Sequence, residues 1–358
     1  DNKRSELENG LISRSGWAVI DDSWEATRAD GSHSFALEPN PEVGYDWWAY
    51  RNDPQAIDLY FMGYGNEYKK AIGDFTKIAG KIPLPPAYVF GYWYSRYYSY
   101  SADDYREIMR EIKKNDIPTD VMILDMDWHW NGKASSESEN IGGWTGWSWN
   151  TNLIPEPTKL LQEIHDNGYK IALNLHPADG IDSIESPSYY KAMSRELGGK
   201  YGSNGKIAWY LDYPDFTKSF FDNVIRDHES EGVDFWWLDW QQDYLYPLVR
   251  GTNMKHLPWM NHIYYNYSSG NHLRGAGFSR WAGWGDHRHP IQFSGDAVGN
   301  WDLLRFEVDL TTTSGNAGCF FWAHDLGGFY DGTDPELYTR WTQFGLLNSS
   351  LRIHSVYD

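Results

Sequence analysis

The sequence predicts an α/β fold in which a (β/α)8 TIM barrel follows a smaller β-rich piece. Its 358 residues are enough for one barrel of about 250 residues and an attached segment. Strand-like and helix-like segments alternate from residue 86 onward, as they do around a parallel sheet. Several strand-like runs end in a carboxylate, and barrel enzymes keep their active sites at the carboxyl ends of the strands.

The first 85 residues are expected to form the end of a β domain and a linker. Short apolar runs separated by turn residues predict strands, followed by a helix near residues 66–78. The predicted strands lie at residues 16–20, 46–50 and 57–62. The segment Lys81-Ile-Pro-Leu-Pro-Pro86 interrupts both periodicities, because proline neither continues a helix nor donates to a sheet. We therefore predict two units, residues 1–85 and 86–358.

Residues 86–358 are predicted to contain seven strands, with an eighth suspected at residues 208–211. The seven lie at residues 89–94, 121–127, 170–176, 233–239, 274–280, 291–296 and 319–325. Helices are expected at residues 102–115, 158–167 and 216–230. Ser101 is placed to cap the first of these helices, and Gly168 to end the second.

Composition restricts the classes of function. The formal net charge of −19 disfavours nucleic acid as a partner, because the phosphate backbone is also negative. The single cysteine, Cys319, excludes an intramolecular disulfide and a cysteine-based zinc site. No run of about 20 apolar residues is present, so no membrane span is expected, and the first residues do not resemble a signal peptide. A cytoplasmic protein and one exported after processing both remain open, as does the oligomeric state.

Polar side chains recur where the predicted strands end, and barrel closure would bring them over one cavity. They are Asp125, Asp127, His176, Asp239, Arg280, Asp296, His324 and Asp325. Two carboxylates flanking a glycosidic bond can share its hydrolysis: one attacks the anomeric carbon while the other protonates the leaving oxygen. Aromatic residues make up 17% of the chain, which suits the flat apolar faces of sugars, although most single rings could equally serve in packing.

Three motifs resemble those of glycoside hydrolase family 31, the retaining α-glycosidases. They are Trp237-Leu-Asp239, Phe293-Ser-Gly-Asp296 and Asp125-Met-Asp127. The resemblance covers the end of an N-terminal β-sandwich and essentially the whole barrel. It implies that Asp239 is the nucleophile, that Asp296 is the acid/base and that Asp125 binds sugar hydroxyls.

Arg280, Asp325, Phe329 and His354 also fit positions of the family, and the resemblance implies a pocket for an oligosaccharide or glycoconjugate, with no cofactor. The full set of expected substrate-binding residues besides Asp125 is Met126, His176, Trp237, Trp240, Arg280, Phe293, Asp325, Phe329 and His354. Departures from the α-glucosidase pattern occur at His176, Gln242 and Phe293. The expected activity is thus a retaining exo-α-glycosidase of α-glucosidase type, with α-galactosidase, α-N-acetylgalactosaminidase or α-xylosidase specificity as the alternatives.

Other interpretations of these residues stay open. Asp239 could pair structurally with Arg280, Asp296 could belong to an ordinary turn, and His354 could only close the barrel. A divalent metal could be held by a subset of strand-end groups, although no His-x-His occurs on the first strand. That subset is Asp125, Asp127, His129, His176 and His324. A carbohydrate-binding pseudo-enzyme is the alternative from another class, but its expected sign, a missing catalytic acid, is absent.

Overall fold

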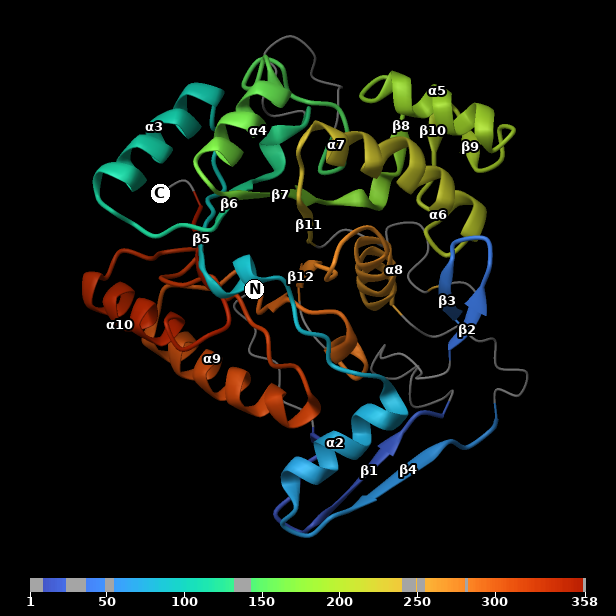
Figure 1. The fold of residues 1–358 in the computed structure, drawn as a ribbon, viewed down its shortest axis with the longest axis vertical. Coiled ribbons are helices and arrows are strands. Elements are labelled where there is room, and N and C mark those ends of the chain that lie inside the picture. The colour runs from blue at the N-terminus through green and yellow to red at the C-terminus, as the bar shows by residue number, and fades with distance from the viewer. Residues whose placement is uncertain are drawn as a thin grey trace.

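The computed structural model describes residues 9–23, 37–48, 55–131, 143–239, 249, 255–280 and 283–356. A curled parallel sheet of seven strands surrounds the centre of the molecule (Figure 1). The strands in sheet order are β13 (Gln292–Phe293), β12 (Phe278–Arg280), β11 (Phe235–Leu238), β7 (Lys170–Leu175), β6 (Val121–Leu124), β5 (Tyr92–Tyr94) and β14 (Leu351–Ile353). Each strand runs parallel to its neighbours, which confirms the predicted parallel sheet.

An eighth segment, residues 320–326, closes this sheet into a barrel between β13 and β14. Ala323 N donates to Gln292 O at 2.9 Å on the β13 side, and Leu326 N donates to Arg352 O at 3.2 Å on the β14 side. The prediction of an eighth strand at residues 208–211 was wrong. That segment forms an irregular connection, and the missing strand is the three-residue β14.

The predicted strands and helices differ from the observed ones mainly at their ends. Residues 87–90 form the 3₁₀ turn η1 (Ala87–Phe90), so the first barrel strand starts later than expected. Helix α3 (Ala102–Lys114) begins at the predicted cap, where Ser101 and Asp104 form a reciprocal capping box. The helix predicted at residues 216–230 is continuous but composite: α6 (Pro214–Phe220), the π-helical turn η4 (Phe221–Ile225) and α7 (Arg226–Glu231).

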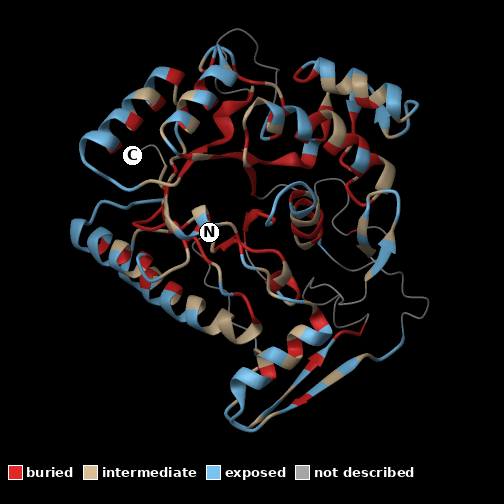
Figure 2. Cartoon of the chain, viewed as in Figure 1, coloured by how far each residue is buried: buried red, intermediate tan, exposed pale blue. Residues whose placement is uncertain are grey.

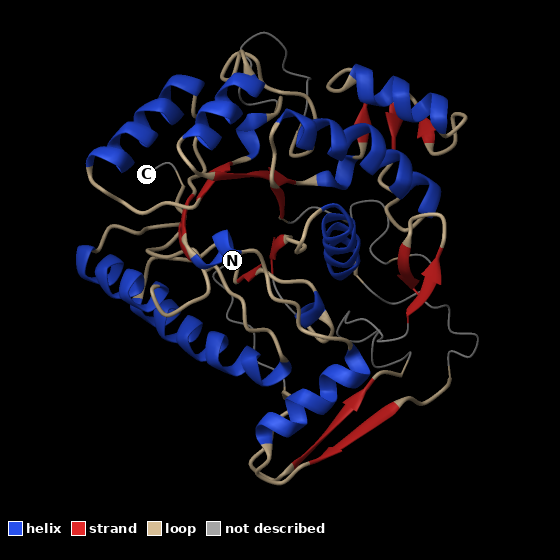
Figure 3. Cartoon of the chain, in the orientation of Figure 1, coloured by secondary structure: helices blue, strands red, loops and turns tan. Residues whose placement is uncertain are grey.

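Helices cover the outside of the sheet (Figure 3). Besides those already given they are α4 (Pro157–Asp166), α5 (Pro187–Glu196), α8 (His256–Asn271), α9 (Trp301–Ser314) and α10 (Pro335–Gly345). Short 3₁₀ turns follow several barrel strands: η2 (Met126–Trp128), η3 (Pro177–Asp179) and η5 (Asp286–Arg288). Another, η6 (Gly315–Ala317), continues from the end of α9. A small antiparallel sheet lies under α5, formed by β8 (Ile181–Asp182), β10 (Lys206–Ile207) and β9 (Gly202–Ser203).

The barrel strands are buried on both faces, which explains their continuous apolar runs (Figure 2). Along β6, Val121 and Ile123 pack inside the barrel, while Met122 and Leu124 pack outward against the helices. This two-residue alternation is the ordinary pleat of a strand. Consequently, a polar residue at an inward position near a strand's carboxyl end must face the mouth of the barrel.

Antiparallel pairs precede the barrel, as expected for part of a β-sandwich. Strand β1 (Trp17–Asp21) pairs with β4 (Leu59–Gly63), and β2 (Leu37–Asn40) pairs with β3 (Tyr45–Trp48). Helix α2 (Tyr68–Ala79) packs Phe75 against the barrel residues Trp284 and His287. We propose residue 86 as the start of the barrel unit, since η1 leads from there into β5.

Candidate active site

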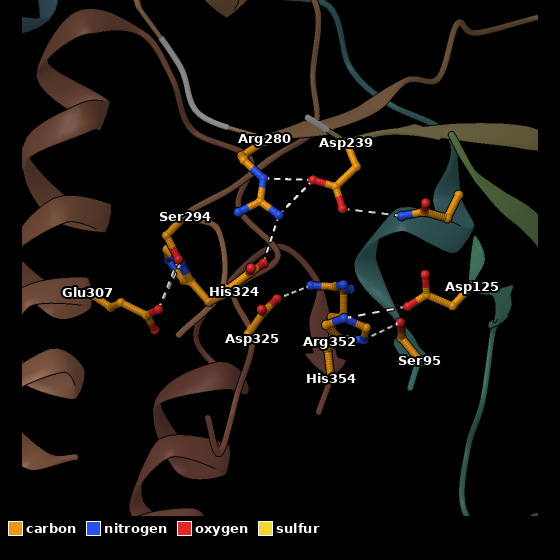
Figure 4. Close-up of polar contacts among 12 residues, drawn as sticks. Ser95, Asp125, Asp239, Arg280, Ser294, Glu307, His324, Asp325, Arg352 and His354 are labelled. Atoms are coloured by element: carbon orange, nitrogen blue, oxygen red, sulfur yellow. Dashed lines mark hydrogen bonds and ion pairs between the residues drawn. The ribbon is translucent and has the colours of Figure 1, made fainter. Parts of the chain in front are cut away.

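Asp239 follows the last residue of β11 and lies in a dense set of hydrogen bonds (Figure 4). Its Oδ1 accepts from Arg280, with Nε at 2.7 Å and Nη2 at 2.6 Å. Its Oδ2 lies 3.3 Å from Asn174 Nδ2 and 3.5 Å from His176 Nε2. Donors therefore surround both oxygens of this carboxylate, although only 6% of the residue is exposed.

The charge of Arg280 decides the ionisation of Asp239. Burial alone would raise the pKa of this carboxyl. The Arg280 guanidinium and then His176 lower the pKa by more than burial raises it, so the net pKa falls far below the usual range. For Arg280, burial acts to lower the pKa, but the charges of Asp239 and Asp296 raise it above the normal value. Asp239 is consequently a carboxylate at any physiological pH.

Asp296 lies in the turn after β13 and contacts the same guanidinium. Its Oδ1 is 2.7 Å from Arg280 Nη2, the nitrogen that also lies 2.6 Å from Asp239 Oδ1. Because one atom touches both oxygens, these two oxygens lie no more than about 5.3 Å apart, which is below the roughly 6.5–9.5 Å separation of inverting glycosidases. The Asp296 side chain is 21% exposed against 8% for Asp239, so solvent reaches it more easily.

Asp125 and His354 form a second polar pair beside the first. Asp125 accepts from the backbone of Met126 at 2.7 Å, and His354 Nε2 lies 3.7 Å from its other oxygen. Ser95 Oγ lies 2.7 Å from His354 Nδ1 and orients the ring (Figure 4). Burial, aided by the charge of Asp239, holds the pKa of Asp125 well above normal, while burial and the Arg352 charge hold the pKa of His354 well below normal. Burial thus favours the neutral form of both groups.

Aromatic rings surround this pair. Phe329 stacks on His354, with ring centres 4.9 Å apart and an interplanar angle of 22°. Trp237 meets the same imidazole edge-on at 5.1 Å, but it is 1% exposed and belongs to the barrel interior together with Phe293. Phe329 thus lies at the side of the site, whereas Trp237 and Phe293 form the packed layer beneath it.

These residues lie together at the mouth of a parallel barrel, the architecture that the chain shares with the proteins it resembles in sequence and fold. The family model described as the glycosyl hydrolases family 31 TIM-barrel domain matches residues 82–358. The chain belongs to glycoside hydrolase family 31. The resemblance indicated by the strand-end motifs is thereby confirmed for the fold and the family.

Curated relatives of this family 31 chain are α-xylosidases and α-glucosidases. It is 26% identical over 318 residues to an α-xylosidase of Saccharolobus solfataricus, covering 82% of the chain and 41% of the relative. It is 24% identical over 351 residues to α-glucosidase 2 of Bacillus thermoamyloliquefaciens, covering 87% and 42% respectively. The chain therefore spans about two fifths of the length of these relatives.

Solved structures of family members share its fold. A Flavobacterium johnsoniae dextranase complexed with glucose aligns with a TM-score of 0.67 at 21% identity, covering 85% of this chain and 40% of the dextranase. An α-xylosidase of Xanthomonas citri aligns with a TM-score of 0.63 at 22% identity, covering 84% and 36%. At this identity the likeness concerns the architecture.

Three residues of the site escaped the sequence analysis. Asn174 donates to Asp239 from an inward position of β7, in the alternation that also brings His176 inward. Arg352 on β14 donates to Asp325, and its guanidinium lies 4.4 Å from the ring centre of Trp237. Trp144 lies against His176, with ring centres 5.3 Å apart. For Asn174 and Arg352 the available signal was a polar residue inside a short apolar strand.

Asp325 and Arg352 form a fully buried ion pair (Figure 4). Burial raises the pKa of Asp325 to about 7, although the positive charge of Arg352 acts in the opposite direction. Burial likewise lowers the pKa of Arg352. Asp325 therefore lies beneath the mouth of the barrel and is held by the chain's own arginine.

The residues considered for a metal have other partners. Asp127 accepts from Ser99 and Asn131, and His129 Nδ1 lies 2.8 Å from the carbonyl of Trp130. Among the described residues, no group of three or more His, Cys, Asp or Glu side chains is arranged to hold a metal ion. Two positions named from the sequence, Trp240 and Gln242, lie outside the described residues. In the described part of the chain, every helix is too short or too polar to cross a membrane.

Proposed function

We propose that this chain is the catalytic barrel of a retaining exo-α-glycosidase, which hydrolyses terminal non-reducing α-linked sugars through a β-glycosyl-enzyme. The observation that carries the proposal is the shared Arg280 nitrogen, which holds Asp239 and Asp296 closer together than an inverting mechanism allows. Family membership gives the α configuration of the substrate. No cofactor is required by this chemistry.

The reaction proceeds in two displacements. In the first, the Asp239 carboxylate attacks C1 as the bond from C1 to the leaving oxygen breaks, and Asp296 transfers its proton to that oxygen. In the second, Asp296 removes a proton from water, which attacks C1 and releases Asp239. The two inversions give overall retention, and both acids return to their starting states. The strongly lowered pKa of Asp239 suits the nucleophile, because the carboxyl is ionised before the attack on C1.

The remaining groups would bind the terminal sugar. Asp125 and His354 can each exchange hydrogen bonds with ring hydroxyls, since their neutral forms offer both donors and acceptors. Phe329 and Met126 can contact the apolar face of the ring, and His176 can reach a hydroxyl close to Asp239. Asp325, paired with Arg352, would bind from the floor of the same pocket.

Within this mechanism we propose α-glucosidase-like specificity, with α-xylosidase, α-galactosidase and α-N-acetylgalactosaminidase activities as the alternatives. Relatives named α-xylosidase and α-glucosidase support the first two about equally. The test is a comparison of kcat/KM on the 4-nitrophenyl α-glucoside, α-xyloside, α-galactoside and α-N-acetylgalactosaminide. A preference for the glucoside of about tenfold or more supports the proposal, and a preference for another sugar replaces it.

The mechanism itself is tested with alanine variants and azide. Asp239→Ala should lose activity while folding normally. Added azide should restore turnover by attacking C1 in place of Asp239, and the product should be the β-glycosyl azide. Asp296→Ala should instead give the α-glycosyl azide from an activated substrate, because Asp239 still forms the intermediate. Asp166→Ala, at an exposed position of α4, is the matched control. If Asp239→Ala kept more than a few per cent of wild-type activity, the assignment of the nucleophile would be overturned. A folded wild type that binds sugars without turnover would favour the pseudo-enzyme.

A further inference from the structure

A second cluster of titratable groups lies directly behind the turn that carries Asp296 (Figure 4). Glu307 on α9 and His324 in the closing segment of the barrel are 1% and 0% exposed. Both reach Ser294, which precedes Asp296 by two residues. The two displacements described above use neither Glu307 nor His324, yet a buried acid and a buried imidazole are costly to keep without a purpose.

The contacts of this cluster form one continuous chain. Ser294 Oγ lies 2.9 Å from Glu307 Oε1 and 2.9 Å from His324 Nδ1. His324 Nε2 lies 2.7 Å from Thr311 Oγ1, and Thr311 donates to the backbone carbonyl of Glu307 at 2.7 Å. The other oxygen of Glu307 accepts from Trp341 Nε1 of α10 at 2.7 Å.

Both hydroxyls of this hydrogen-bonded chain donate to Glu307. Ser294 Oγ donates to Oε1 of the carboxyl, and Thr311 Oγ1 donates to the backbone carbonyl. His324 lies between the two hydroxyls, with one ring nitrogen within hydrogen-bond distance of each. The carboxyl of Glu307 is therefore linked to the imidazole of His324 through Ser294.

Burial and nearby charges favour the neutral forms of Glu307 and His324. Burial, with a smaller contribution from the negative charge of Asp325, raises the pKa of Glu307 to about 8, although hydrogen bonds from Trp341 and Ser294 oppose the rise. Burial and the Arg352 charge lower the pKa of His324 to about 3. Around neutral pH the whole chain is thus uncharged, and it adds no negative charge beside the two reacting carboxylates.

The turn that carries Asp296 is held by packing and by backbone contacts. The His324 ring stacks on the ring of Trp322 and on the ring of Phe344 of α10. On the far side of Asp296, Tyr330 N donates to Ala297 O at 2.9 Å. Gly328 approaches Gly299 so closely that a Cβ at Gly328 would lie 2.6 Å from the Gly299 Cα. The Asp296 turn is therefore fixed by backbone contacts on one side and by Ser294 on the other.

We propose that Glu307, His324 and Ser294 act as positioning residues, forming an uncharged hydrogen-bonded chain that aims the Asp296 carboxyl at the leaving oxygen. This inference rests on the proposed function and deepens it. Its consequence is specific to proton transfer. Loosening the chain should slow substrates whose leaving group must be protonated, and should spare those whose leaving group departs unaided.

The experiment compares kcat/KM for two substrates of the preferred sugar, a methyl α-glycoside and an α-glycosyl fluoride. The variants are Ser294→Ala, Glu307→Gln and Glu307→Leu, with Ser269→Ala as the matched control at an exposed position of α8. Ser294→Ala and Glu307→Leu should lower kcat/KM on the methyl glycoside by about 30-fold or more and on the fluoride by less than about threefold. Glu307→Gln replaces the carboxyl with an uncharged amide that can still hydrogen-bond to Ser294 and to Trp341. Its kcat/KM should therefore stay within about threefold of wild type on both substrates.

The outcomes separate this inference from the proposed function. Equal losses by Ser294→Ala on both substrates, or no loss on either, would overturn the positioning role while leaving the two displacements intact. A large loss by Glu307→Gln would overturn the neutral state of Glu307. A wild type inactive on both glycosides would overturn the proposed function itself. If Glu307→Leu fails to fold, Ser294→Ala and Glu307→Gln still decide the result.

Discussion

Asp239 and Asp125 follow two strands of the same barrel and are equally buried, each with 6% of its surface exposed, yet their ionisation differs. The pKa of Asp239 lies far below normal and that of Asp125 well above. The difference comes from their partners. Arg280 contacts Asp239 directly, whereas the basic side chain beside Asp125 is His354, at 3.7 Å, whose own pKa is depressed.

The comparison shows that burial alone does not assign a role to a carboxyl. In both residues burial raises the pKa, and only a cation within hydrogen-bond distance reverses the direction. The site consequently keeps one ionised acid for attack and one neutral acid for hydrogen bonding to a substrate. The predictions below test this division.

The largest expected effect comes from replacing each acid with the amide of the same shape. Asp239→Asn should lower kcat by about 10⁴-fold, because an amide cannot form the glycosyl ester. Asp125→Asn should lower kcat/KM by about 10- to 100-fold, mainly through KM, because an amide still resembles a neutral acid. Steady-state kinetics on the preferred glycoside checks both, with Asp166→Asn as the control. Equal losses in the two variants would remove the distinction.

The next effect concerns the cation. Arg280→Ala should lower kcat/KM by about 10³-fold, and it should raise the pKa of Asp239 toward the range expected for a buried acid. The acidic limb of the pH profile of kcat/KM should then move to higher pH, since Asp239 must lose its proton before it can attack. Arg305→Ala, which removes an exposed arginine of α9, should leave the profile unchanged. An unshifted acidic limb in Arg280→Ala would contradict the role given to Arg280.

The smallest effect is on stability. In the unfolded chain Asp125 ionises near its normal pKa of 3.8, whereas the folded chain keeps its proton to higher pH. Raising the pH through this interval therefore favours unfolding of the wild type but not of Asp125→Asn. The melting temperature of Asp125→Asn relative to wild type should rise as the pH is raised above the normal pKa of 3.8. A difference that stays constant or shrinks would mean that folded Asp125 is ionised.

The sequence predicted the order of the barrel strands better than their ends. Seven of the eight barrel segments were located, because continuous apolar runs and the carboxylates that follow them are visible along the chain. The remaining barrel segment, β14, was missed because it has only three residues with Arg352 in the middle. The apolar residues 208–211 were mistaken for a strand in its place. Short strands depend on pairing partners that lie far away along the chain.

Parts of the site were similarly hidden. Arg280, Asp239 and Asp296 were named together from the sequence, and the structure brings them into contact. Trp237 and Phe293 were expected to line the pocket but pack inside the barrel, because the strand alternation turns them inward below the mouth. Glu307 gave no signal, since a glutamate on a helix is usually exposed. Its burial results from the way α9 and α10 pack around the closing segment.

The measurement that tests the central claim most directly is covalent trapping of the intermediate. Wild-type protein is incubated with 5-fluoro-α-glycosyl fluorides of glucose and xylose, digested, and analysed by mass spectrometry to locate the attached sugar. The account predicts one sugar per chain, in ester linkage to Asp239, and no label on Asp239→Asn. A label on Asp296 or Asp125, or inactivation without any covalent sugar, would contradict it.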